Sequence, residues 1–196
     1  MRTRDVGAPN PETAMTAATA AGKPITLAEL ARLDRDEFVC LLGDIFEHSP
    51  WVAERAYARR PFGTIDELHR AMAAAVQNAS VAERVALLRA HPDLAGREAR
   101  DGTLTDASTG EQARAGLNAL SAAEMRRITE LNQAYRERHG IPFIACVGHY
   151  TKAGIFFEFE RRLGNDPEAE IREALVQVYA IARLRLAAMF AQASPA

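Results

Sequence analysis

Apolar residues recur along most of the chain at the spacing of one helix face. In the clearest run they fall at i, i+3, i+4, i+7 and i+8, the period of an amphipathic helix: Phe38, Leu41, Leu42, Ile45 and Phe46. A second run, from Ile171 to Ile181, keeps this period with a slight drift. The best strand candidate, residues 141–147, is short and isolated, and a lone strand has no partner. The pattern predicts an all-α fold.

Helix starts are marked by Ser, Thr or Asp with Glu three residues later, the spacing of a capping box. Five pairs have this spacing: Asp34 and Glu37, Thr64 and Glu67, Ser80 and Glu83, Ser108 and Glu111, Ser121 and Glu124. Ser49-Pro50 and Asp166-Pro167 mark two further starts. Gly140 and Gly164 stand where left-handed helix terminators belong. Together these signals predict helices over about 27–33, 35–47, 50–59, 65–78, 81–90, 109–118, 122–139, 151–163 and 167–192.

The chain divides into one folded domain with two short ends. Residues 1–24 are rich in Ala, Thr, Pro and Gly and lack apolar periodicity, so they cannot offset the entropy of ordering and are predicted to be a tail. Residues 25–192 are predicted to form a single compact multi-helix domain, followed by a C-terminal tail over 193–196. With 196 residues in total, the chain is long enough for one real hydrophobic core.

Composition narrows the class of protein. A formal net charge of −2 gives no long-range field suited to nucleic acid. No apolar run approaches the roughly eighteen residues of a membrane span, and no hydrophobic segment follows the N-terminal arginines, so neither a spanning helix nor a secretory signal is expected. Cys40 and Cys146 lie far apart in apolar runs without CxxC spacing. They are predicted to be buried free thiols in a reducing compartment, which favours the cytoplasm.

One long segment interrupts the helical pattern. Residues 91–107 are nearly all polar or small, and a loop of this length in a compact domain is usually functional or mobile. Pro92 disfavours the helical conformation at His91, so the preceding helix must end near this histidine. His91 is therefore a candidate catalytic side chain. It also has a purely structural interpretation, because a protonated histidine suits the C-terminal end of a helix dipole.

Three further features carry both a structural and a functional interpretation. Glu111 can cap the helix that starts at Ser108, and the free N–H groups there, with Gln112, can bind a carboxylate or imide oxygen. Residues 143–147 can be buried core, or an extended segment whose amides and carbonyls bind a flat, amide-rich ligand. Arg183 and Arg185 lie two residues apart on one helix, so one is expected to face solvent and the other can meet an anion.

Six ordered blocks of the chain resemble the 2-oxo-4-hydroxy-4-carboxy-5-ureidoimidazoline (OHCU) decarboxylases. They are FEHSPWVAERA (46–56), AHPDLAG (90–96), the Ser108-x-x-Glu111-Gln112 element followed by AGL (115–117), LNQAYRERHGIPFIACV (131–147), ERRLGN (160–165) and IARLRL (181–186). The resemblance runs from about Leu27 to Phe190, and six blocks in order are far more specific than any one alone. One departure is His139-Gly140-Ile141, where family members commonly have an aromatic residue on each side of the glycine.

The resemblance implies an all-α enzyme, usually dimeric and free of cofactors, that converts OHCU to (S)-allantoin after urate oxidase and hydroxyisourate hydrolase have acted. It implies that His91 is the catalytic histidine, to which we assign proton transfer, and that Glu111 orients the imidazole or bonds the ureido N–H groups. The substrate-binding residues that it implies are Pro92, Ser108, Gln112, Phe143, Ile144, Ala145, Cys146, Val147 and Arg185. The absence of GxGxxG, Walker, nucleophile-elbow and HExxH motifs agrees with a site without cofactor or metal.

Two alternatives from other classes remain on the residues alone. The first is a helical interaction module without catalytic activity, in which residues 91–107 form a docking loop. The second is a helical metalloenzyme that uses His91, His149 and Glu47. The first predicts no effect on the decay of fresh substrate, and the second predicts metal in the purified protein.

Overall fold

All regular structure in the described part of the chain is helical. The computed structural model describes residues 25–191 and contains no β-strand within that range. Its helices are α1 (Leu27–Leu30), α2 (Arg35–Leu42), α3 (Pro50–Tyr57), α4 (Ile65–Gln77), α5 (Val81–Arg89), α6 (Arg97–Asp101), α7 (Asp106–Arg114), η2 (Leu117–Ala119), α8 (Ala122–His139), η3 (Val147–His149), α9 (Lys152–Leu163) and α10 (Pro167–Ala191). The all-α prediction is confirmed. The tails predicted over 1–24 and 193–196 lie outside the described residues.

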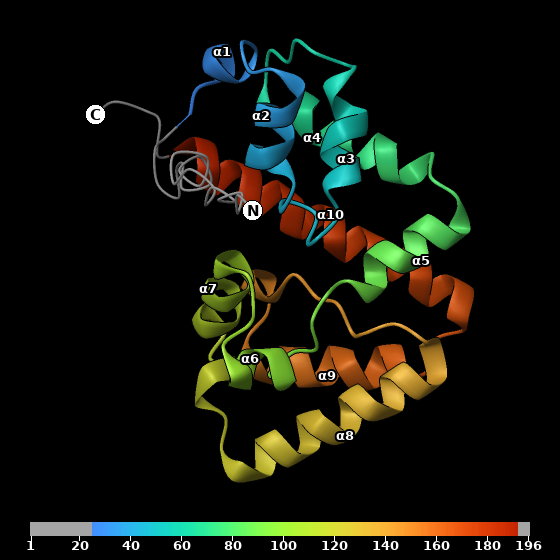
Figure 1. Ribbon diagram of the computed structural model, residues 1–196. Helices are drawn as coiled ribbons and strands as arrows, with labels where there is room; N and C mark the ends of the chain where they lie inside the picture. The colour runs from blue at the N-terminus through green and yellow to red at the C-terminus, as the bar shows by residue number, and fades with distance from the viewer. Residues whose placement is uncertain (1–24, 192–196) are drawn as a thin grey trace, which may run out of the picture.

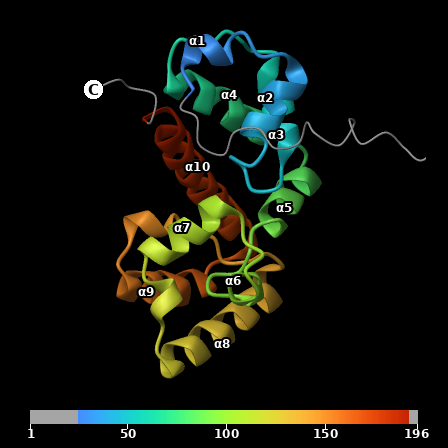
Figure 2. The same cartoon turned by 60° about the vertical axis from the view of Figure 1, so that its left-hand side comes forward.

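The helices form two groups with α10 between them (Figures 1 and 2). Helices α1–α4 lie on one side of α10 and α6–α9 on the other, and α5 leads from the first group to the second. In the first group α2 packs on α3 and α3 on α4, which contacts α10, while in the second group α8 packs along α9. The loops that leave α5 and α8 meet beside α10, and a cavity lies where they meet.

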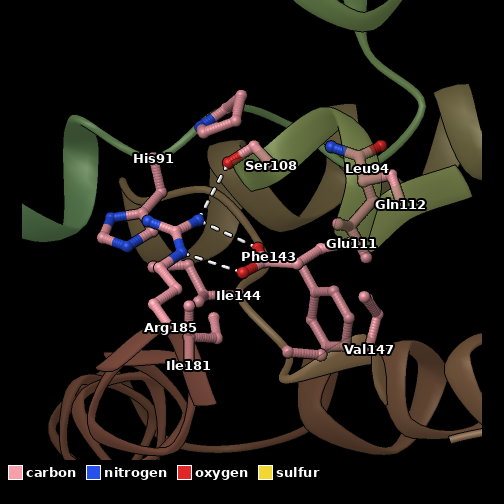
Figure 3. Close-up of a pocket in the computed structure, with 12 residues that line it drawn as sticks. His91, Leu94, Ser108, Glu111, Gln112, Phe143, Ile144, Val147, Ile181 and Arg185 are labelled. Carbon is pink, nitrogen blue, oxygen red and sulfur yellow. Dashed lines mark hydrogen bonds and ion pairs between the residues drawn. The ribbon is translucent and has the colours of Figure 1, made fainter. Parts of the chain in front are cut away.

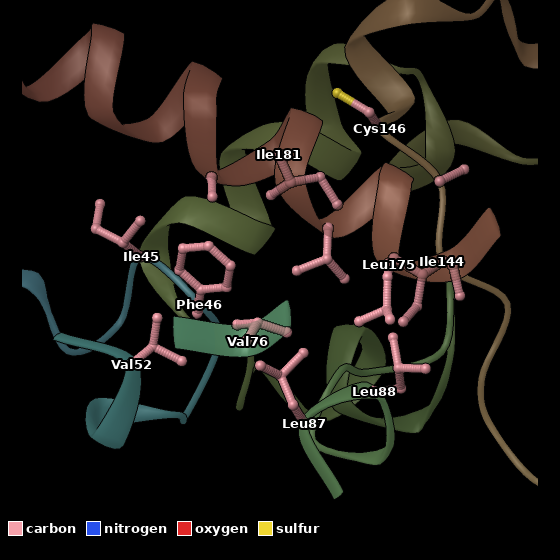
Figure 4. Close-up of a cluster of buried hydrophobic side chains, with 14 of the residues drawn as sticks. Ile45, Phe46, Val52, Val76, Leu87, Leu88, Ile144, Cys146, Leu175 and Ile181 are labelled. Carbon is pink, nitrogen blue, oxygen red and sulfur yellow. The ribbon is translucent and has the colours of Figure 1, made fainter. Parts of the chain in front are cut away.

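The hydrophobic core is continuous across α10. Figure 4 shows Leu175 and Ile181 of α10 gathered with Val76 of α4, Leu87 of α5 and Ile144 of the segment after α8. All five side chains belong to the buried core cluster. Burial of an aliphatic side chain of this size contributes about 1.5–3 kcal/mol. The core therefore fixes α5, α10 and the segment after α8 relative to one another, and the cavity is bordered by α10, by this segment and by the loop that follows α5.

Helix α10 is long and apolar enough to cross a membrane by length and composition, and it alone among residues 25–191 passes that test. The sequence pattern did not predict this, because Arg183 and Arg185 interrupt its apolar run. In the folded domain 44% of its most apolar stretch is buried, and the helix packs against α4, α5 and α8. It also buries Glu170 and Gln177. Its apolar character is that of a central core helix.

Most of the predicted helix starts are confirmed. At α2, α5 and α8 the caps Asp34, Ser80 and Ser121 form complete capping boxes. At α4 only half of the box forms, because Glu67 turns its carboxylate to the N–H of Gly63. Such a cap contributes about 1 kcal/mol to its helix.

Several local predictions were wrong. Helix α2 ends at Leu42 and not near residue 47, because residues 43–48 form turns in which Glu47 and His48 have positive φ values, which a right-handed helix cannot contain. Cys40 is exposed, since it points away from the face that buries Phe38 and Leu42. Cys146 is a buried free thiol, as predicted.

Two terminal predictions also differ from the structure. Ser49 precedes α3 but its side chain makes no capping hydrogen bond. Gly164 follows α9 with a φ of −79°, so it is right-handed, and its N–H closes the last turn on the carbonyl oxygens of Arg161 and Arg162. Gly140, by contrast, ends α8 in the left-handed conformation with a φ of 68°.

Candidate active site

A single cavity joins residues from four separate parts of the chain (Figure 3). It encloses about 370 Å³ of empty space, including the part that opens to solvent. The loop after α5, helix α7, the segment after α8 and helix α10 each supply a wall. The residues that line it are His91, Pro92, Leu94, Ser108, Glu111, Gln112, Phe143, Ile144, Ala145, Val147, Ile181 and Arg185.

His91 stands at the end of α5, as its proline neighbour predicts. Its ring Nδ1 lies 3.0 Å from the carbonyl oxygen of Leu87, and a carbonyl can only accept, so Nδ1 carries a proton. Burial lowers the pKa of His91 to about 4, against the Leu87 hydrogen bond and the charge of Glu47, which raise it. The imidazole is therefore neutral near pH 7, and its Nε2 holds a free lone pair.

Helix α7 begins earlier than predicted, and this changes the role of Ser108. The cap is Thr105, whose Oγ1 accepts the N–H of Ser108 at 3.2 Å. The predicted capping box of Ser108 and Glu111 is therefore wrong. Because both residues lie inside the helix three positions apart, with Gln112 next to Glu111, all three side chains lie on the face turned to the cavity. Residues 91–107 also contain a short helix, α6, where a structureless loop was predicted.

Gln112 of α7 is bonded to the loop after α5, to which Pro92 belongs. The Oε1 atom of Gln112 accepts the N–H of Ala95 at 2.8 Å, which ties α7 to the loop after His91. Ala95 has a φ of 48°, an unfavourable value for a residue with a side chain. This hydrogen bond helps to hold that conformation.

Arg185 is the most heavily bonded side chain of the site. Its Nε and Nη2 atoms donate to the two carboxylate oxygens of Glu111 at 2.8 and 2.9 Å, and Nη2 also donates to the Ser108 hydroxyl oxygen at 3.0 Å. On the other side, Nη1 lies 2.8 Å from Glu47 Oε2 and 3.2 Å from the carbonyl oxygen of Asp44. Only 8% of the residue is exposed. Burial opposes the charged form, but the two carboxylates more than offset it and raise the pKa of Arg185.

Arg183 does not line the cavity. The two-residue spacing of Arg183 and Arg185 predicts that they lie on different faces of the helix. The Nε of Arg183 donates to Asp66 of α4 at 2.8 Å, in a pair that is largely open to solvent. The two guanidinium groups thus lie on different faces of α10.

Glu47 is a buried site residue that the sequence analysis considered only as a metal ligand. It lies in the turn between α2 and α3, is 1% exposed, and has a φ of 22°, next to His48 with a φ of 46°. Its carboxylate accepts hydrogen bonds from Ser108 and Thr105 and pairs with Arg185. Burial would raise the pKa of Glu47, but the charge and hydrogen bond of Arg185 outweigh it, so the pKa lies below its ordinary value.

The apolar segment after α8 forms the floor of the cavity. Four of its five predicted residues line the cavity, but Cys146 does not. Its N–H donates to Gln177 Oε1 at 2.9 Å, and burial raises the pKa of its thiol. The carbonyl oxygen of Ile144 accepts from Arg162 at 2.7 Å. Part of the segment's backbone is thus bonded within the protein, and residues 142–146 have no regular secondary structure.

The structure brings ten of the eleven predicted site residues around one cavity and leaves out Cys146. Sequence reasoning missed Leu94 and Ile181, which line it as ordinary apolar residues. It also missed Glu47 as a partner of Arg185. One signal in the sequence could have indicated this role: Glu47 directly follows the apolar run that ends at Phe46. A carboxylate at such a position is expected to be buried, and a buried carboxylate requires a partner. Within residues 25–191 no three His, Cys, Asp or Glu side chains are grouped to hold a metal, so His91, His149 and Glu47 do not form such a site.

Comparisons with known proteins show which family the chain is similar to. Residues 31–187 match the family model described as OHCU decarboxylase. The chain is 47% identical to the OHCU decarboxylase of Haloferax volcanii, over 85% of this chain and 96% of that protein. It is 41% identical to the OHCU decarboxylase of Halalkalicoccus jeotgali, over 83% of this chain and 90% of that protein. The crystal structure of an (S)-allantoin synthase aligns with a TM-score of 0.68 at 33% identity, over 84% of this chain and 54% of the other.

The family model covers most of the chain, and relatives at this identity extend over nearly their full length. Four of the six blocks that carried the resemblance in the sequence, those around residues 90–96, 108–117, 131–147 and 181–186, supply residues that line the cavity. The chain belongs to the OHCU decarboxylase family.

Proposed function

We propose that the chain decarboxylates OHCU to (S)-allantoin in urate degradation, with His91 as the proton-transfer residue. One observation carries this proposal: a neutral imidazole with a free Nε2 shares a small cavity with the Arg185–Glu111 pair and with an extended apolar segment. Such a cavity suits a flat ring that carries both an anionic group and several amide groups. The competing role as a docking module gives no account of a buried histidine beside two buried charges.

The substrate supplies its own electron sink. One ring carbon of OHCU carries the hydroxyl and the carboxylate, and its neighbour belongs to a C=N bond and carries the ureido group. When the bond to the carboxylate breaks, its electron pair forms a C=C bond between these two carbons, and the C=N nitrogen takes up a proton. The enol that results becomes a ketone when the hydroxyl loses its proton and the neighbouring carbon gains one. The net change is loss of CO2 and gain of one proton, without redox chemistry or a cofactor.

His91 can carry the proton in both directions. Its Nε2 lone pair accepts the hydroxyl proton, and the same atom then returns a proton to one face of the neighbouring carbon, which sets the configuration of allantoin. A pKa of about 4 makes the free imidazole a weak base. A substrate carboxylate in the cavity adds a negative charge beside it, and this raises its proton affinity when it is needed.

The remaining residues hold the ring in place. Glu111, held in place by two hydrogen bonds from Arg185, accepts N–H groups of the ureido arm. The Gln112 amide nitrogen and the Ser108 hydroxyl face the cavity as further polar groups. The backbone groups of residues 143–147 that remain available read the ring edge; the carbonyl oxygens of Ile144 and Val147 are already taken by Arg162 and by the N–H of Tyr150. Pro92 and Ile181 close the faces of the ring. Positioning of this kind keeps the carboxylate out of the ring plane, where its bond can break.

The decisive test follows chirality, because OHCU also decays without enzyme. OHCU is generated in situ from urate with the two upstream enzymes, and circular dichroism records the allantoin that forms. The wild-type chain should give one enantiomer, and His91→Asn should give the racemic background with an intact fold. His69→Asn is the matched control, because His69 also bonds a backbone carbonyl, that of Tyr179, but lies outside the cavity. Near-normal turnover by His91→Asn would remove His91 from the mechanism.

We further propose that the enzyme is a cytoplasmic homodimer. The cytoplasm is supported by two cysteines that are both free, and the dimer by the family resemblance. Light scattering after gel filtration should give twice the 21.4 kDa of one chain. A monomer at micromolar concentration would contradict the dimer.

A further inference from the structure

We propose that Glu47 is a positioning residue of this active site, which fixes Arg185 and Ser108 from behind and leaves the pocket with an excess negative charge. This inference rests on the proposed decarboxylase function and assigns a role to a residue that does not line the main cavity. It acts through its neighbours and touches no substrate.

The hydrogen bonds of Glu47 orient Arg185 and Ser108. Glu47 takes the Nη1 side of the guanidinium at 2.8 Å, together with the Asp44 carbonyl oxygen, and so leaves the Nε and Nη2 edge for Glu111. The same carboxylate accepts the Ser108 hydroxyl at 2.9 Å. A hydroxyl has one proton, so with that proton committed to Glu47 the Ser108 oxygen can accept from Arg185 at 3.0 Å. Glu47 therefore sets the direction of both hydrogen bonds.

The buried position of Glu47, in a turn with unfavourable backbone angles, costs folding free energy. Glu47 is 1% exposed, and both it and His48 have left-handed backbone conformations that side chains disfavour by roughly 1–3 kcal/mol. A neutral partner for Arg185 already exists in the Asp44 carbonyl, and a charged one in Glu111. The fold therefore keeps a strained turn and a second buried carboxylate that charge balance does not require. Strain and unbalanced buried charge are typical of sites that use them.

The charges of Arg185, Glu47 and Glu111 do not balance. Arg185 contributes one positive charge, and Glu47 and Glu111 contribute two negative charges, so the group carries a net charge of −1. With Glu47 in place, the positive charge of Arg185 is shared, and Glu111 stays a strong acceptor for N–H groups of the ligand. The same negative charge supports the protonated form of His91 during proton transfer.

Other charged groups also surround His91, and they limit how much the charge of Glu47 affects the protonation of His91. A neighbouring hollow of about 540 Å³ opens on the other side of the His91–Pro92 wall. The charged and titratable groups around His91, from the cavity and from this hollow, are Glu47, His48, Arg89, Glu98, Glu111, Arg136 and Arg185. Among them Glu47 is the acid that acts most strongly on His91. Removal of its charge alone should therefore be visible in the titration of His91.

The test compares Glu47→Gln, which keeps shape and one acceptor oxygen but loses the charge, with Glu47→Asp, which keeps the charge and withdraws it by one methylene. Asp66→Asn is the control, because Asp66 pairs with Arg183 two residues along α10 at the surface. We expect Glu47→Gln to lower kcat by about 10–100-fold with less than a threefold change in KM, since positioned acid–base groups contribute roughly 10²–10⁴-fold. We expect it also to shift the acid limb of the kcat/KM profile to lower pH. Glu47→Asp should keep the wild-type acid limb.

A second measurement needs no turnover. The His91 imidazole is titrated by NMR in the ligand-free wild type, in Glu47→Gln and in Asp66→Asn. A lower His91 pKa in Glu47→Gln alone supports the inference, even in the event that the chain makes no single allantoin enantiomer and the proposed function fails. A folded Glu47→Gln protein with wild-type kcat and an unchanged His91 titration overturns it. So does a loss of activity in both Glu47 variants that only follows the fraction of unfolded protein.

Discussion

Two arginines of this domain are almost completely buried, and both pair with carboxylates, but only one borders a cavity. Arg162 of α9 is 0% exposed; its Nε donates to Glu170 at 3.0 Å and its Nη1 to the Ile144 carbonyl oxygen at 2.7 Å. The hydroxyl of Tyr135 also donates to Glu170. Arg185 pairs with two carboxylates and turns one edge to the cavity. The Arg162 group is neutral and closed, whereas the Arg185 group is negative and open.

The difference separates a structural ion pair from a functional one. In the Arg162 group every charge is matched, and burial keeps the pKa of the Tyr135 phenol well above its ordinary value, so the phenol stays a donor. This group joins α8, α9 and α10 to the segment that floors the cavity. The Arg185 group has two carboxylates for one guanidinium, so its charge sum is −1. An excess charge of this kind is available to a ligand, and we therefore expect activity to depend on Arg185 and stability to depend on Arg162.

The largest expected effect is on stability. Arg162→Met removes one partner of a fully buried ion pair and leaves Glu170 without its cation, a change that typically costs about 3–5 kcal/mol. Urea unfolding followed by circular dichroism measures the loss. The double variant with Glu170→Met removes both charges and should recover a large part of it. A single variant within about 1 kcal/mol of wild type would show that this pair is not what holds the segment after α8.

The next effect is on activity. Arg185→Lys keeps the charge, but an ammonium group cannot donate to Glu111 through two parallel hydrogen bonds and reach Glu47 and Ser108 as well. We expect kcat/KM to fall about 10²-fold, which corresponds to roughly 2.7 kcal/mol of transition-state stabilisation. Arg183→Lys is the control on the same helix and should retain wild-type kcat/KM. The chirality assay gives both values, and a loss of equal size in the two variants would contradict the comparison.

A smaller effect links pH to stability through His91. Its pKa is about 4 in the folded protein and about 6.5 in the unfolded chain. Above pH 6.5 both states are neutral there, so His91 adds no slope. Below it the unfolded chain binds the proton first, so stability falls as pH drops, by about 1.4 kcal/mol per unit at most. Urea unfolding of wild type at pH 7 and 5.5 should show this loss, and His91→Asn should lack it. Glu47 contributes in a lower window, because its lowered pKa lies under 4.5.

The residues that make up the site could be predicted from the sequence more completely than the local geometry of the site. Helix periods and capping boxes located most helices, since these signals depend on near neighbours along the chain. The role of Ser108 was wrong because the choice between two caps, Thr105 and Ser108, depends on the distant Glu47, which bonds both side chains. That Cys146 does not line the cavity could not be predicted, because its hydrogen bond with Gln177 of α10 is a tertiary contact. Only the fold could reveal that Arg185 faces two acids.

The smallest effects come from removing one hydroxyl from each arginine group. Tyr135→Phe deletes a donor to Glu170, which keeps Arg162 and Asn165 as partners, so we expect a loss of about 1–2 kcal/mol in unfolding free energy and unchanged kcat. Ser108→Ala deletes the hydroxyl that lies between Glu47 and Arg185, and should cost a similar free energy of unfolding while kcat falls about tenfold. Equal stability losses with unequal kcat would separate the two groups, because the chemical change is the same in both. If Tyr135→Phe lowered kcat as much as Ser108→Ala, the closed arginine group would have to act on the cavity through the Ile144 carbonyl that Arg162 holds.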